Sequence, residues 1–226
     1  MPAGHLESPF LQYLIHHDLG VGERLPTLQE LSGELGVSVG KLREQLEVAR
    51  GLGLVSVRPR LGIQREPFDF GTVVREGMMF ALASGEGTFE QVSNMRQVLE
   101  IGLWEAAVEA LTAEDIGRLR QLAGQRMGQI ARRTCTHPTA EHRALHLTIF
   151  SKLNNPFVQG LLNSYWEAYE AYQLTRFTQY TYWIDAWNYH EQIVEALAAG
   201  EAMRGKQLLI EHFALLRPAV GARSKK

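Results

Sequence analysis

Four histidines in the second half of the chain have the residue type and spacing of a metal site. His142 and His146 are four residues apart in a stretch with helical periodicity, so both imidazoles should lie on one helical face. His190 and His212 lie in two later amphipathic segments. Helical bundles build metal sites in their cores from such residues on facing helices. The spacing therefore indicates a metal site, and ordinary surface or core histidines remain the alternative.

The bulk composition is that of a soluble globular protein. Apolar residues make up 45% of the 226 residues and charged residues 21%. No apolar run approaches the roughly 18 residues that span a bilayer, and no secretory signal is visible. Cys135 is the only cysteine, which excludes an intrachain disulfide and favours a reducing compartment. We therefore expect a cytoplasmic protein with no membrane contact.

Three helices and a hairpin are predicted in the first 66 residues. Thr27 and Ser38 suit helix N-caps, and Glu30 completes a capping box with Thr27. Short helices joined by a tight turn with glycine predict a helix-turn-helix. Two β-type runs on either side of residues 58–62 predict a small wing.

Positive charge gathers in the third predicted helix and the wing. The net charge of the whole chain is −2, which gives no nucleic-acid signal. Between residues 38 and 65, however, six Lys and Arg residues stand against two Glu residues. A basic helix followed by a basic wing is typical of a protein that binds duplex DNA. A solvated helix with an exposed turn is the alternative interpretation.

Residues 10–64 resemble the winged helix-turn-helix of the GntR family of bacterial transcription regulators. The resemblance rests on Leu25-Pro26, Leu35 to Ser38, Leu42-Arg43-Glu44, Leu46, Gly53-Leu54-Val55 and Arg58 to Gly62. It implies DNA contacts by Ser38, Lys41, Arg43, Arg58 and Arg60.

The sequence departs from the family pattern at two DNA-reading positions. Gln29 or Glu30 stands where the family has an arginine early in the second helix, and Val39 replaces the arginine after Ser38. Each missing contact is worth roughly 1–3 kcal/mol if it is made to a base. The operator sequence therefore cannot be carried over from the family.

The remaining chain is predicted to be entirely helical. A linker at residues 67–71 should separate a DNA-binding domain (1–66) from a helical domain (72–220), and residues 221–226 should form a disordered basic tail. The predicted helices are 72–83, 88–110, 113–134, 138–153, 156–177, 180–199 and 203–216. Short connections imply an antiparallel bundle of six or seven helices, so the whole fold is mainly α.

The helical half resembles the FCD effector-binding domain found in the FadR subfamily of GntR regulators. The resemblance rests on Arg96 and Glu100 as an R-x-x-x-E pair, on residues 142–158 as a D-x-x-x-H helix followed by Asn-Pro, and on residues 189–213 as the closing helix pair. In this family one Asp and three His commonly hold a divalent metal, a small carboxylate completes the coordination, and an early arginine pairs with it.

Carried over to this chain, the three histidine positions of that family site fall on His146, His190 and His212. The Asp position falls on His142. Four neutral imidazoles would suit Zn²⁺ or Ni²⁺ better than Mg²⁺ or Mn²⁺, and would leave the ion more positive toward an anion. Alternatively His142 points away and three histidines form the site, or the pocket holds no metal.

The resemblance also indicates effector-binding residues. Arg96 is either an anchor for the effector carboxylate or a structural ion-pair partner of Glu100. Trp183 and Trp187 precede His190 and are expected to wall the pocket. An aromatic stripe is either core or interface, or a ligand cage; it consists of Tyr165, Trp166, Tyr169 and Tyr172.

Together these patterns predict a homodimeric transcription regulator rather than an enzyme. It would bind a palindromic operator in double-stranded DNA and respond to a metal and a small carboxylate metabolite. One alternative is a metal-dependent hydrolase, although no carboxylate or nucleophile is evident beside the histidines. Another is a sensor whose DNA binding is degenerate.

Overall fold

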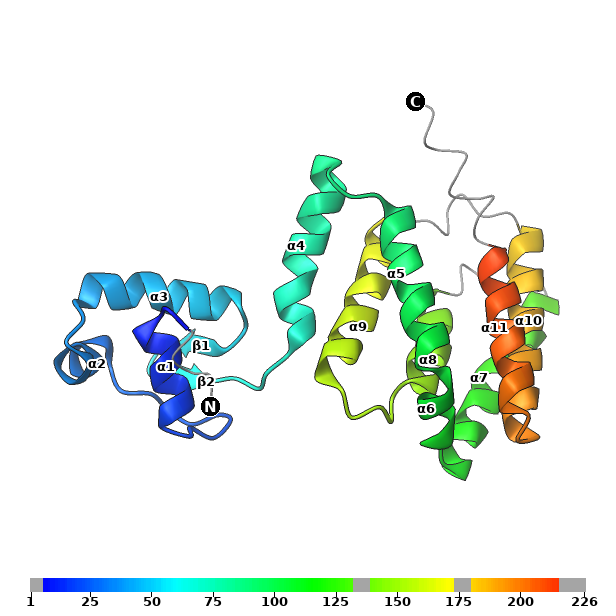
Figure 1. Cartoon of the computed structure of the whole chain (residues 1–226), viewed down its shortest axis with the longest axis horizontal. Coiled ribbons are helices and arrows are strands. Elements are labelled where there is room, and N and C mark those ends of the chain that lie inside the picture. The colour runs from blue at the N-terminus through cyan, green and yellow to red at the C-terminus, as the bar shows by residue number, and fades with distance from the viewer. Residues whose placement is uncertain (1–5, 132–138, 173–179, 216–226) are drawn as a thin grey trace. The chain divides into compact units, whose positions relative to one another are not determined.

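The chain forms two compact units that divide at Val73 and Val74 in the computed structural model, which describes residues 6–131, 139–172 and 180–215. The first unit contains three helices and one two-stranded sheet, and the second contains helices in its described parts (Figure 1). The predicted mainly α fold class is thus confirmed. Among the described residues, no helix is both long and apolar enough to cross a membrane. The predicted tail lies outside the described residues.

The elements of the first unit follow the predicted order. They are α1 (Pro9–His16), α2 (Leu28–Leu35), α3 (Val39–Gly51), β1 (Val55–Arg58) and β2 (Gly62–Arg65). The capping box is present, because Thr27 Oγ1 accepts from the Glu30 amide at 3.3 Å and the Thr27 amide donates to Glu30 at 2.7 Å. Ser38 caps α3. Gly36 ends α2 in the left-handed conformation, with a φ of 65°.

The core of the first unit holds α3 and the wing in place. Phe10, Leu31 and Leu42 come from the three helices and are fully buried together. The wing pairs antiparallel in the register Val55↔Arg65 to Arg58↔Gly62. These contacts fix α3 and the hairpin as one rigid surface for the residues predicted to contact DNA.

Eight helices follow the wing in the described parts of the chain, and the first of them, α4, begins just before the boundary between the units. They are α4 (Phe70–Ser84), α5 (Phe89–Gly102), α6 (Trp104–Glu109), α7 (Ala113–Ala131), α8 (Thr139–Ile149), α9 (Pro156–Ala171), α10 (Tyr180–Ala198) and α11 (Ala202–Ala214). Helix α4 takes the last two residues of the predicted linker, because Asp69 accepts from the Gly71 amide at 2.9 Å and so caps the helix.

The single helix predicted for residues 88–110 is broken in the structure. It ends at Gly102 and resumes at Trp104, with Leu103 at φ −101° and ψ 4°. The apolar periodicity continues across the break, which is why the sequence pattern did not reveal it. After the break, Trp104 is fully buried and donates from its indole to the Ala202 carbonyl at 2.8 Å.

Packing brings helices distant in sequence around one interior. Helix α10 packs against α7 and α11, α5 packs against α9 and α11, and α8 packs against α7 and α9. Figure 1 shows α10 and α11 side by side, and α5 beside α9. Side chains from α5, α8, α10 and α11 thereby meet at one buried point.

Candidate metal and effector site

The four predicted histidines meet in the interior of the bundle. Their ligand nitrogens all lie within 4.8 Å of one another, and every one of the four residues is at most 1% exposed. Nε2 of His190 is 3.3 Å from Nε2 of His146 and 3.3 Å from Nε2 of His212. We refer to His142, His146, His190 and His212 as the histidine cluster.

Three helices position the cluster. Helix α8 presents His142 and His146 on the face that also buries Leu145 and Ile149. Helices α10 and α11 form a hairpin that turns at Gly200, whose φ of 75° suits a glycine. This turn places His190 and His212 beside each other with ring centroids 4.4 Å apart.

Electrostatics keep the cluster neutral. Burial, followed by the positive charge of Arg96, lowers the pKa of His146 well below its ordinary value. Burial and neighbouring imidazoles likewise lower the pKa of His142 and His190. Neutral imidazoles retain a lone pair for a metal ion.

Several cluster nitrogens lack a hydrogen-bond partner. They are both ring nitrogens of His142, Nδ1 of His190 and Nδ1 of His212. A buried polar group without a partner costs about 1–3 kcal/mol. The unpartnered nitrogens of His142 and the cluster of neutral imidazole donors fit a divalent transition metal, since the Nε2 atoms of His146, His190 and His212 lie together and each can present a lone pair.

Arg96 makes the ion pair that the sequence suggested and still has a free donor. Its Nε donates to Glu100 Oε1 at 2.6 Å, and its Nη1 donates to the Tyr165 hydroxyl at 3.1 Å. Burial alone would lower the pKa of Arg96, but Glu100 and Tyr165 raise it above its ordinary value. Nη2 is buried without a partner. The ion-pair role does not exclude the anchoring role.

Glu100 makes a contact with the cluster that the sequence did not predict. The sequence showed no carboxylate beside the histidines, but Oε2 of Glu100 lies 2.8 Å from Nδ1 of His146. The sequence indicated only the ion pair with Arg96, which lies four residues before Glu100. It gave no sign of the contact with His146, because that histidine is 46 positions away. Both oxygens of the carboxylate are bound to neighbours.

Aromatic side chains surround the cluster. Trp166 and Trp183 lie with ring centroids 4.7 Å and 5.9 Å from His142, and Trp187 lies 4.8 Å from His190. The indole N–H groups of all three are buried without an acceptor. The hydroxyls of Tyr169 and Tyr182 also lack partners. Arg96 Nη2 and these groups give the interior a surplus of donors.

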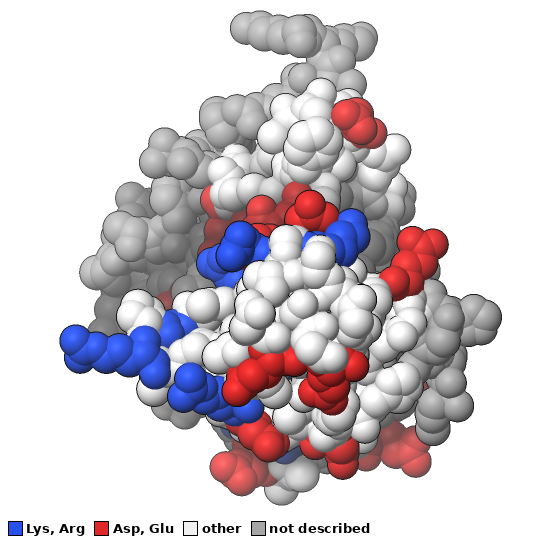
Figure 2. Space-filling model, turned by 90° about the vertical axis from the view of Figure 1, so that its left-hand side faces the viewer, with Lys and Arg blue, Asp and Glu red and all other residues white. Residues whose placement is uncertain are grey.

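The predicted DNA-contacting residues lie on the surface of the first unit. Ser38, Lys41, Arg43, Arg58 and Arg60 are all exposed. Lys41 is paired with Glu44 at 3.0 Å, and Arg58 with Glu66 at 3.5 Å. Within the described part of the chain, Arg43 and Arg60 have no such partner. Figure 2 shows basic and acidic side chains next to one another on one face of the molecule.

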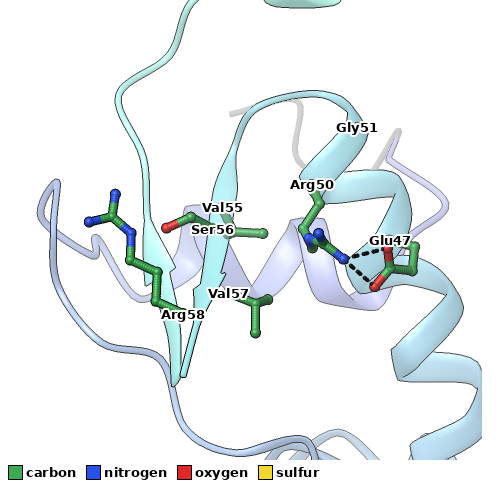
Figure 3. Close-up of a pocket in the computed structure, with 7 residues that line it drawn as sticks. All are labelled: Glu47, Arg50, Gly51, Val55, Ser56, Val57 and Arg58. Carbon is green, nitrogen blue, oxygen red and sulfur yellow. Dashed lines mark hydrogen bonds and ion pairs between the residues drawn. The ribbon is translucent and has the colours of Figure 1, made fainter. Parts of the chain in front are cut away.

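A surface pocket of about 550 Å³ separates the end of α3 from the wing. Figure 3 shows Arg50 turned toward Glu47, to which it donates at 2.8 Å and 2.7 Å, while Arg58 extends from β1 away from α3. Arg50 is therefore held by an acid on its own helix.

Comparison with known families decides what kind of protein carries this site. The profile of the FCD domain matches residues 91–215, which is more than half of the chain. The chain belongs to the FCD domain family.

Relatives of this FCD protein cover both of its units. It is 27% identical over 208 residues to the HTH-type transcriptional regulator YcbG of Bacillus subtilis, covering 89% of this chain and 82% of the relative. It is 25% identical to the HTH-type transcriptional regulator LutR of the same organism, covering 86% and 90%. A solved Streptococcus agalactiae GntR has the same fold, with a TM-score of 0.68, 15% identity and 93% and 96% coverage.

These similarities confirm the predicted family. The protein is a GntR-family transcription regulator with an FCD effector-binding domain. Its relatives and structural neighbours are transcription regulators and not enzymes, and the protein belongs to that class. The hydrolase alternative is therefore set aside.

Proposed function

We propose that this regulator binds one divalent metal ion through the histidine cluster and that the ion is Zn²⁺. The observation that carries the proposal is the 3.3 Å spacing of the Nε2 atoms. With a metal–nitrogen bond of about 2.0–2.1 Å, ligands of a tetrahedral site lie roughly 3.3–3.4 Å apart. Two spacings of this size allow His146, His190 and His212 to share one ion. Neutral imidazole ligands suit Zn²⁺, which is commonly held by histidine nitrogens in a tetrahedral site.

His142 is the least tightly placed member of the cluster. No hydrogen bond joins its ring nitrogens to those of the other three, although the ligand nitrogens all lie within 4.8 Å of one another. In a four-ligand site it takes the position of the missing carboxylate, and in a three-ligand site it faces the effector. A His142→Ala variant separates the two arrangements, since only the first predicts weaker metal binding.

We also propose a small carboxylate metabolite as the effector. Arg96 Nη2 and the indole N–H groups of Trp183 and Trp187 are buried donors that lack acceptors. A carboxylate is an acceptor-only group when ionised and pairs well with a guanidinium. Four neutral ligands would also leave the full positive charge of the metal ion in place, and that charge would attract the anionic effector.

The regulator is proposed to act as a homodimer on a palindromic operator. Two recognition helices and two wings require twofold-related half-sites. We assign the DNA contacts to Ser38 and Lys41 at the start of α3, to Arg43 on its exposed face, and to Arg58 and Arg60 in the wing. The effector would bind the DNA-competent state and the other state of the regulator with different affinities. Operator affinity would change by the same factor, because the two binding events are linked.

Metal analysis of the purified protein tests the metal proposal. We expect about one Zn²⁺ per chain, lost in a His146→Ala variant and retained in a His16→Ala control on the surface of α1. Absence of bound metal after purification and after Zn²⁺ addition would contradict it.

An electrophoretic mobility shift with the protein's own upstream DNA tests the regulator proposal. The expected result is a specific shift that changes when a series of small carboxylic acids is added. No specific shift at low salt with any palindromic site would overturn it.

A second candidate is a sensor with degenerate DNA binding. It is favoured by Val39 in place of the expected arginine and by the acidic partners of Lys41 and Arg58. Unlike the operator-binding function, it predicts no effect of Arg43 on DNA affinity.

A further inference from the structure

Glu100 joins the two halves of the proposed site. It projects from α5, is 1% exposed, and uses each carboxylate oxygen for a different partner. Oε1 accepts from Arg96 Nε at 2.6 Å, and Oε2 lies 2.8 Å from His146 Nδ1. One side chain therefore contacts both the proposed anion anchor and a proposed metal ligand.

The charge state of Glu100 follows from its partner. Its Oε1 lies 2.6 Å from Nε of the fully buried Arg96. We assign the ionised form, because a neutral Glu100 would leave the buried guanidinium of Arg96 without a counter-charge. An ionised carboxylate accepts hydrogen bonds and cannot donate them.

The hydrogen bond to His146 then fixes the position of its proton. Since Glu100 only accepts, Nδ1 of the neutral ring must carry the hydrogen. Nε2 keeps its lone pair, and it is the atom that lies 3.3 Å from Nε2 of His190. Metal-binding histidines commonly have a carboxylate on the far ring nitrogen, which fixes the tautomer and the ring orientation.

We propose that Glu100 is the positioning residue of the metal site, holding His146 as the Nδ1–H tautomer with Nε2 directed into the histidine cluster. This inference rests on the proposed metal-binding function. It assigns the buried Arg96–Glu100 pair a role beyond structural support, because Arg96 keeps the carboxylate ionised and oriented toward His146.

Glu100→Gln breaks this arrangement with almost no change in size. Glutamine offers one acceptor oxygen and one amide donor, whereas both Arg96 and His146 present donors to this position. The charged Arg96 takes the oxygen, since hydrogen bonds with an ionised donor are stronger. The amide N–H₂ then faces His146, whose Nδ1 must become the acceptor, and the proton moves to Nε2 and blocks the ligand atom.

Two measurements on the full chain test the proposal. In metal-free protein labelled with ¹⁵N-histidine, NMR should show the Nδ1–H tautomer of His146 in the wild type and the Nε2–H tautomer in Glu100→Gln. Competition with a chromophoric chelator should show Zn²⁺ affinity about 10- to 100-fold lower in Glu100→Gln. Glu105→Gln, an identical change at an exposed residue of α6, should leave both unchanged.

The outcomes separate the inference from the function on which it rests. Wild-type protein that binds Zn²⁺ while Glu100→Gln binds it equally well would overturn the role of Glu100 alone. An Nε2–H tautomer of His146 in the metal-free wild type would overturn it without any variant. Wild-type protein that binds no Zn²⁺ would overturn the metal-binding function and this role together.

Discussion

The two units of the molecule handle their polar side chains in opposite ways. On the surface of the first unit, Lys41, Arg50 and Arg58 are each paired with a nearby acid. In the interior of the second unit, His142, Arg96 Nη2 and several indole N–H groups have no partner. Surface ion pairs contribute about 0–1 kcal/mol and exchange readily with water or phosphate. Buried groups cannot form hydrogen bonds with bulk water instead, so the absence of a partner points to a bound ligand.

The comparison indicates where substitutions should matter. In the first unit, Lys41 and Arg58 can be lost at small cost to the fold, and the loss should appear in DNA affinity. In the second unit, each buried group holds its neighbours as well as a proposed ligand. Changes there should therefore have larger effects, and these should appear in stability or metal affinity.

The largest effect is expected from His190→Ala. His190 Nε2 lies between the Nε2 atoms of His146 and His212, so its loss removes the centre of the cluster. Loss of a hydrogen-bond partner behind a ligand costs about 10- to 100-fold, and loss of a ligand should cost more than about 100-fold in Zn²⁺ affinity. Chelator competition measures this, with His17→Ala on the surface as control. Unchanged Zn²⁺ affinity would contradict the claim that the buried polar groups of the second unit bind a metal.

Gly205→Ala should strain the bundle through close packing. A Cβ at this position would lie 2.8 Å from Cζ2 of the buried Trp104 ring. Overpacking typically costs about 1–3 kcal/mol, so thermal unfolding should occur at a lower temperature. Because α11 also carries His212, Zn²⁺ affinity should fall as well.

A matched glycine provides the control for that prediction. Gly117 in α7 is exposed, and a Cβ there would meet nothing within 4 Å. Gly117→Ala should stabilise the helix by about 0.5–1 kcal/mol. Equal effects of the two substitutions would show that contact with Trp104 does not limit the packing of α11.

Arg43→Ala should weaken DNA binding by about 1–2 kcal/mol. If Arg43 contacts a phosphate, the salt dependence of binding should fall by about one contact, and if it contacts a base, specificity at that base should relax. Arg43 is exposed and, within the described residues, lacks an acidic partner, so nothing in the fold depends on it. Operator titrations at several salt concentrations measure the effect. Arg204→Ala, at an exposed arginine of α11, serves as control. Unchanged affinity would favour the degenerate sensor.

Thr27→Ala should give the smallest effect, confined to local stability. Loss of a helix N-cap costs about 0.5–2 kcal/mol, typically near 1. Chemical denaturation should show this loss, while Zn²⁺ affinity stays at the wild-type value. Ser32→Ala in the same helix leaves the capping box intact and should change stability less. Any loss of metal binding in Thr27→Ala would mean that the two units are coupled energetically.

Local patterns in the sequence determined much of this protein. The Thr27 and Glu30 capping box and the basic hairpin were both predicted, and both occur in the structure. The spacing of His142 and His146 likewise predicted one helical face. Such features depend on hydrogen bonds and side-chain spacing within a few residues, so a single sequence contains the necessary information.

Tertiary packing decided the rest. The contact between Glu100 and His146 spans 46 positions, and the break at Leu103 interrupts a helix whose apolar pattern is continuous. Neither has a local signature, because both depend on how α5, α8 and α11 fit together. The sequence alone determined which residues are able to bind a metal or DNA, whereas only packing decided that a buried carboxylate would lie behind one of the histidines.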